Sequence, residues 1–132
     1  MTTYDFNDGN GPVLAHRHTN GGGWVADTAD VAATAYIGVN ALVFGYARVS
    51  DNACVLGNAC VLGNACVSDN ARVYGYACVS DNACVSDNAK VFGNAWVFGD
   101  AWVYDNARVL GDIRVHGNAP SQKISDDYDI SG

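Results

Sequence analysis

The chain has 132 residues, the size of one small domain, and a formal net charge of −7. All 14 acidic residues are aspartates, which favour turns over helices, and the acidic balance argues against binding to nucleic acid. No apolar run reaches the roughly 18 residues of a membrane-spanning helix, so we expect no membrane partner.

Residues 1–23 contain no basic stretch followed by an apolar core, so we expect no secretory signal there. We interpret this segment as an N-terminal cap. The chain has 5 cysteines, separated by six or twelve residues. An odd number of cysteines without a signal peptide predicts reduced thiols in the cytoplasm, of a bacterial cell or of an infected host cell.

From residue 24 onward the sequence repeats every six positions. Valine or isoleucine occupies every sixth position from Val25 to Val115, with alanine two residues earlier from Ala29 to Ala107. A period of six fits neither an amphipathic helix nor a meander of long strands. Glycine, aspartate or asparagine follows two or three residues later and suits a tight corner. Each hexad is therefore predicted to form one short strand and one corner, with the β-branched residue facing inward.

A second period, of 18 residues, lies over the first. The tripeptide Ser-Asp-Asn follows Val49, Val67 and Val85, and glycine recurs at matching corners with the same spacing. Three hexads per turn describe a triangular prism. The predicted fold is therefore all-β, a parallel β-helix of about five coils of 18 residues spanning residues 24–119. The acidic segment 120–132 is predicted to be a short C-terminal cap.

The Gly-Asn-Ala-x-Val hexads of residues 24–119 resemble the hexapeptide-repeat superfamily, whose fold is a left-handed parallel β-helix. The preceding stretch GGGWVADTADVAATAYIG, residues 21–38, is similar to uncharacterised hexapeptide proteins of bacteria and their phages. This resemblance implies the handedness of the helix, and it implies no activity.

Two of the three outer faces are expected to carry contiguous apolar or aromatic columns. A monomer rarely exposes so much apolar surface, so we predict a homo-oligomer, most simply a trimer, in which these faces meet. The alternative is that the stacked side chains only stabilise the ladder of coils. The predicted interface residues are Phe44, Leu56, Leu62, Phe98 and Leu110.

A basic column is the most specific feature of the predicted surface. Arg72, Lys90 and Arg108 share one face, where like charges in adjacent coils repel. One interpretation is a strip that binds an anionic, ring-bearing ligand such as a nucleotide. The predicted ligand-binding residues are Arg72, Lys90, Arg108, Tyr74, Phe92, Trp96 and Trp102. The other interpretation is neutralisation, in the same subunit or a neighbour, by the aspartates that lie three residues earlier, namely Asp69, Asp87 and Asp105.

These aspartates, with Asp51, also form a column that offers carboxylates to a cation such as Ca²⁺. Aspartate at such corners usually accepts hydrogen bonds from nearby backbone N–H groups. We therefore expect no bound metal and no cofactor.

The hexapeptide-repeat superfamily includes two kinds of enzyme that the histidines of this chain can be compared with. A γ-class carbonic anhydrase needs three convergent histidines, but of His16, His18 and His116 only the last lies in the repeats. An acyltransferase of this fold uses a catalytic histidine with an inserted arm or C-terminal domain, whereas these hexads run without interruption. We therefore expect a non-catalytic binding protein, with a phage-type protein that sequesters a nucleotide-like ligand between subunits as one example. The alternative is a structural or protein-interaction scaffold.

Overall fold

The structure is a computed structural model that describes residues 2–112, 114–117, 123–124 and 129–130. All secondary-structure elements in these ranges are β-strands. The same ranges contain no helix with the length and hydrophobicity needed to cross a membrane.

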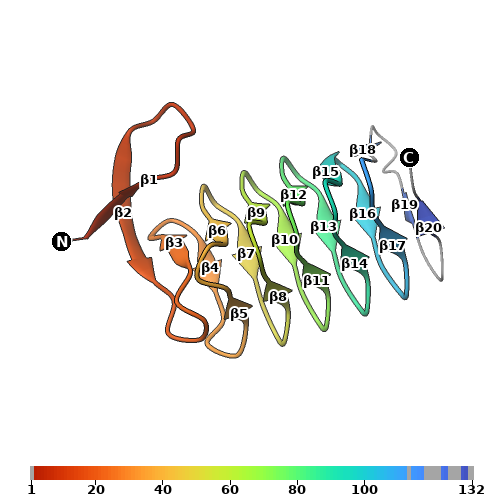
Figure 1. The fold of residues 1–132 in the computed structure, drawn as a ribbon, viewed down its shortest axis with the longest axis horizontal. Coiled ribbons are helices and arrows are strands. Elements are labelled where there is room, and N and C mark those ends of the chain that lie inside the picture. Colours follow the sequence, from red (N-terminus) through yellow and green to blue (C-terminus); the bar gives the residue numbers. More distant parts are fainter. Residues whose placement is uncertain (1, 113, 118–122, 125–128, 131–132) are drawn as a thin grey trace.

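The strands form three sheets, one along each side of a stack of coils (Figure 1). Sheet 1 contains β1 (Thr3–Asp5), β2 (Pro12–Arg17), β3 (Trp24–Ala26), β6 (Leu42–Val43), β9 (Cys60–Val61), β12 (Cys78–Val79), β15 (Trp96–Gly99) and β18 (Arg114–Gly117). Sheet 2 contains β4 (Asp30–Val31), β7 (Arg48–Val49), β10 (Cys66–Val67), β13 (Cys84–Val85), β16 (Trp102–Val103) and β19 (Lys123–Ile124). Sheet 3 contains β5 (Tyr36–Ile37), β8 (Cys54–Val55), β11 (Arg72–Val73), β14 (Lys90–Val91), β17 (Arg108–Val109) and β20 (Asp129–Ile130).

The parallel strands pair in a register of 18 residues. Val49, Val67 and Val85 are direct neighbours in sheet 2, and all three side chains are fully buried. Valines and alanines of all three sheets line one continuous core. This register confirms the prediction from the two sequence periods. The fold is a β-solenoid of about five stacked parallel coils of roughly 18 residues.

The corners require a left-handed backbone conformation, which explains their composition. Asp69 has φ 59° and Gly75 has φ 70°, in the region that glycine and aspartate tolerate best. Successive coils also approach closely here, because a Cβ on Gly75 would lie 3.0 Å from the backbone N of Gly93. The corner residues therefore let three short strands close into one flat coil.

The N-terminal segment forms an antiparallel hairpin of β1 and β2, and β2 pairs antiparallel with β3. The hairpin stands at one end of the stack (Figure 1). After β2 the chain crosses the first strand of sheet 3, where Ile37 N–H donates to Asn20 and Gly23 N–H donates to Ile37. The buried His18 Nε2 contacts the Ala35 carbonyl at 2.8 Å. The N-terminal hairpin thus adds antiparallel pairing, whereas the strands of the repeats pair in parallel.

The C-terminal segment contributes two short strands to the end of the solenoid. Lys123–Ile124 pairs in parallel with β16, and Asp129–Ile130 pairs in parallel with β17. The described part of segment 120–132 therefore extends two sheets of the solenoid. The rest of that segment lies outside the described residues.

Candidate binding groove

The basic column predicted from the sequence lies on sheet 3. Arg72 pairs in register with Lys90, and Lys90 pairs with Arg108. Each of these three residues begins a strand and precedes a fully buried valine, so its side chain points away from the core. Neighbouring strands are about 4.8 Å apart, which sets the spacing of the rows. We call Arg72, Lys90 and Arg108 the basic file.

A groove of about 420 Å³ runs along the basic file. Its other walls are the asparagines of the corner before each strand. The lining residues are Asn70, Arg72, Asn88, Lys90, Asn106 and Arg108. Each coil thus contributes one amide and one cation, and the groove consists of three similar rows.

An acidic file lies on the other side of the asparagines. It consists of Asp51, Asp69, Asp87 and Asp105, and the last three of these line a second groove, of about 480 Å³. Their carboxylates accept backbone hydrogen bonds from the next coil: Asp69 N–H donates to Asp51 at 3.3 Å, and Asp87 N–H donates to Asp69 at 3.2 Å. The hydrogen bonds and the positive φ angles confirm that these aspartates serve the corners.

Neutralisation within one subunit is not what the structure shows. Among the described residues, no side chain of the basic file forms an ion pair within 4 Å. The two files are separated by the asparagine of each corner, which holds unlike charges apart. Among the described side chains, the basic file has no carboxylate close enough to neutralise its three charges.

Two predicted aromatic residues lie beside the basic file, but not in its groove. The rings of Tyr74 and Phe92 stack on each other, with centroids 4.9 Å apart and an interplanar angle of 3°. Leu56 and Leu110 occupy the neighbouring rows of the same column. One face of each ring is thus occupied by the other ring.

Residues 65–81 and 101–117 match the family model described as the YdcK Beta solenoid repeat. The chain is similar to a known solenoid repeat. The two matched segments begin two coils apart, and each contains an arginine of the basic file at the same position of the coil. No curated protein and no solved structure was found to match the chain.

The two tryptophans that were predicted to bind the ligand lie on other faces of the solenoid. Trp96 belongs to sheet 1, where its indole N–H donates to Ser80 Oγ at 2.8 Å. Trp102 belongs to sheet 2, and its indole N–H donates to Ser86 Oγ at 3.2 Å. Their exposed fractions are 38% and 40%. Within one chain, neither tryptophan joins the basic file.

The predicted interface column of sheet 1 needs one correction. Phe44 is only 7% exposed, because Phe6 of the N-terminal hairpin stacks on it with ring centroids 4.7 Å apart. Leu62 packs against the same cluster and is half-buried. The chain itself therefore covers Phe44, and the prediction of Phe44 as an exposed interface residue is wrong. Leu56, Phe98 and Leu110 remain partly exposed on their faces.

The hairpin also creates an apolar cavity of about 510 Å³ that the sequence analysis missed. It lies between the hairpin and the corner after β6, and its apolar walls include Val13, Leu14, Phe44 and Tyr46. No periodic signal in residues 1–23 predicts this contact. The sequence of β2, Pro-Val-Leu-Ala-His-Arg, does not alternate apolar and polar residues, so it gives no strand signal either.

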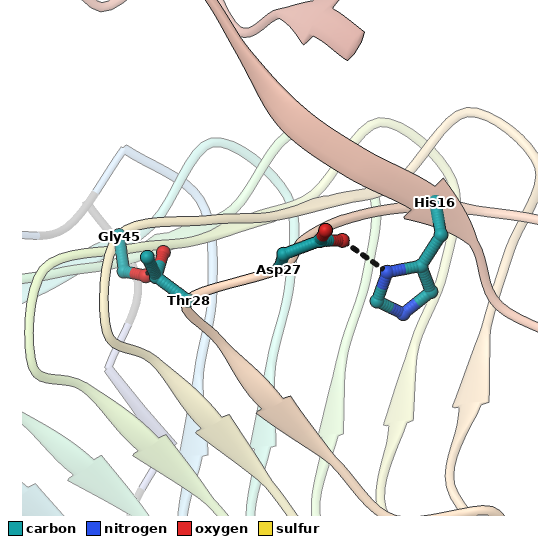
Figure 2. Close-up of polar contacts among 4 residues, drawn as sticks. All are labelled: His16, Asp27, Thr28 and Gly45. Carbon is teal, nitrogen blue, oxygen red and sulfur yellow. Dashed lines mark hydrogen bonds and ion pairs between the residues drawn. The ribbon is translucent and has the colours of Figure 1, made fainter. Parts of the chain in front are cut away.

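A histidine–aspartate pair joins the hairpin to the first coil (Figure 2). His16 Nδ1 lies 2.7 Å from Asp27 Oδ1, and the neighbouring Thr28 hydroxyl donates to the Gly45 carbonyl of the next coil. His18 is buried against a backbone carbonyl, and the side chain of His116 lies outside the described residues. Among the described side chains, no group of three or more His, Cys, Asp or Glu is arranged to hold a metal ion.

The five cysteines are free thiols. Four of them are register neighbours on two faces, Cys66 beside Cys84 on sheet 2 and Cys60 beside Cys78 on sheet 1. On sheet 1, the hydrogen bond from Cys60 lowers the pKa of Cys78 to about 7, and the same contact, with burial, raises the pKa of Cys60. On sheet 2, burial and the neighbouring Cys66 raise the pKa of Cys84 to about 11. The in-register spacing thus makes equivalent cysteines chemically unequal.

Alkylation with iodoacetamide is expected to modify Cys78 first. Its rate should rise through a midpoint near pH 7, since the lowered pKa populates the thiolate above that pH. Replacing Cys60 with alanine removes the hydrogen-bond donor, so the pKa of Cys78 rises and its rate at pH 7 falls about fivefold. Mass spectrometry of labelled peptides measures this. The control Cys54→Ala, on sheet 3, should leave the profile unchanged; equal effects of both variants would contradict the assignment.

Proposed function

We propose that the protein is a non-catalytic, homo-oligomeric binding protein whose basic file captures a small anionic ligand. The observation that carries this proposal is the groove of about 420 Å³, in which three basic side chains form no ion pair with described residues. Three like charges in adjacent rows repel one another, and a bound anionic ligand would offset this repulsion. The basic file is a local exception in a chain of net charge −7.

The geometry of the solenoid supports capture without rearrangement. Backbone hydrogen bonds hold each row in place: Arg72 N–H donates to Ala89 at 3.0 Å, and Lys90 N–H donates to Ala107 at 2.9 Å. Guanidinium groups bind phosphate or carboxylate oxygens through two parallel hydrogen bonds, and asparagine amides add further donors. A ligand that enters the groove meets donors on a fixed scaffold, which reduces the entropy cost of binding.

Three finer assignments belong to this proposal. The six-residue period supports membership of the hexapeptide-repeat superfamily, with a left-handed solenoid. The partly exposed apolar side chains of sheets 1 and 3 support a homotrimer, in which grooves between subunits bring a tryptophan of one copy toward the basic file of another. The free thiols support a reducing compartment such as the cytoplasm.

Thermal unfolding with nucleotides and coenzyme A tests the proposal. A ligand present at a hundredfold excess over its Kd should stabilise the folded protein by about 2.7 kcal/mol and raise the melting temperature. The double variant Arg72→Ala/Arg108→Ala should lose that shift. Arg48→Ala/Arg114→Ala, which removes the same charge elsewhere, should keep it. Absence of any shift across the ligand panel would refute the proposal.

The second candidate is a structural scaffold, favoured by the acidic file beside the basic file. The acidic file of one copy can oppose the basic file of another, and the attraction between these opposite charges would stabilise the assembly. Light scattering distinguishes the two candidates: in a scaffold, the basic-file double variant dissociates the oligomer, whereas in a binding protein it remains assembled.

A further inference from the structure

The basic file is a straight row of identical steps, which constrains the shape of any ligand. Its three cations follow the strand spacing of about 4.8 Å and so extend over about 10 Å along the solenoid axis. Every row pairs one cation with one asparagine. The rows are more widely spaced than the successive phosphates of a phosphate chain. The long side chains of the two outer rows can lean toward the middle row, so the three cations can converge on a short line of anionic groups.

The groove offers no surface on which a nucleobase can stack. Its six lining side chains are all basic or amide groups. Tyr74 and Phe92 present their faces to each other, and both tryptophans lie on other sheets of the same chain. Recognition within one subunit therefore depends on charge and hydrogen bonds.

The acidic file limits the width of the ligand. It runs parallel to the basic file, and the asparagine of each corner lies between the two files. Carboxylates of the acidic file line the adjacent groove. A broad polyanion such as a nucleic-acid duplex would cover both files and meet the repulsion of the aspartates. A narrow chain of anionic groups covers only the basic file.

We propose that the basic file binds linear oligophosphates and selects them by the number of phosphate groups, with one phosphate for each row. This inference rests on the proposed function and specifies its ligand. A nucleotide would then be bound through its phosphate chain, and its base would remain outside the groove. Arginine and lysine contact phosphate by charge-assisted hydrogen bonds, so each added row should tighten binding about tenfold.

Isothermal titration calorimetry with two matched ligand series tests the proposal. One series is orthophosphate, pyrophosphate and tripolyphosphate, and the other is AMP, ADP and ATP. The affinity is expected to rise about tenfold for each phosphate in both series, and ligands with equal phosphate number should agree within a few-fold.

The variant Arg108→Gln removes the cation of one terminal row. Tripolyphosphate should then bind as weakly as pyrophosphate does, and pyrophosphate binding should change little, because two rows remain. The slope of log K against log salt concentration should fall by about one. The control Arg48→Gln, on sheet 2 and outside the groove, should change none of these values. Circular dichroism verifies that both variants fold.

The outcomes separate this inference from the function on which it rests. If AMP binds as tightly as ATP, or if the base-free series does not bind, the row-by-row inference is wrong and anion capture stands. If tripolyphosphate binding is unchanged in Arg108→Gln, the inference is also wrong. If no ligand of either series binds, the inference is wrong. Thermal unfolding with nucleotides and coenzyme A then tests the proposed function separately.

Discussion

Replacing Val73 with aspartate is expected to destroy the cooperative fold. Val73 is fully buried in a middle coil, with Val55 and Val91 in register on either side. An unpaired carboxylate at this position loses its hydration and gains no hydrogen-bond partner, a change that costs more than about 4 kcal/mol. This loss is comparable to the whole stability of many small domains, about 5–15 kcal/mol.

Urea denaturation followed by circular dichroism measures this effect. Val31→Asp provides the matched control, because Val31 lies in the first strand of sheet 2 and is only partly buried. We expect Val31→Asp to lower the unfolding midpoint much less, since a terminal coil can open while its neighbours remain stacked. Equal midpoints for the two variants would show that burial in the stack does not determine stability.

Truncation of Phe6 to alanine is expected to release the N-terminal hairpin. Phe6 is 5% exposed and stacks on Phe44, and the change removes a buried aromatic ring, which typically costs about 3–5 kcal/mol. The loss should be local, because the hairpin contacts one end of the solenoid (Figure 1).

Hydrogen exchange detected by mass spectrometry distinguishes local from global opening. In Phe6→Ala, the amides of residues 3–17 should exchange faster, whereas those of residues 43–109 should keep their protection. Leu14→Ala, in the same hairpin and already 44% exposed, is the control and should have a small effect. Accelerated exchange throughout the repeats would mean that the hairpin stabilises the entire solenoid.

The repeats were predictable because each hexad places the same types of residue at the same positions. Val25 and its equivalents determine the inner face, and the corner residues determine where each strand ends. Once the 18-residue period is recognised, the neighbours of Arg72 follow by counting, and so does the placement of Trp96 and Trp102 on the other two faces.

Residues 1–23 were not predictable in the same way, because no period relates them to the coils. The stacking of Phe6 on Phe44 is a contact between distant parts of the chain that no local pattern encodes. The same holds for the orientation of rings. The sequence placed Tyr74 and Phe92 beside the basic file, but only the coordinates show that the rings cover each other and leave the groove to cations and amides.

The strict register of the coils allows such a protein to gain or lose whole coils during evolution. Because each coil contacts only the coils before and after it, duplication or deletion of one 18-residue unit preserves every type of core contact. Where the unit carries Arg72, Lys90 or Arg108, the same event lengthens or shortens the basic file by one charge. The number of basic rows can thus change by duplication or deletion of a coil, without a new fold.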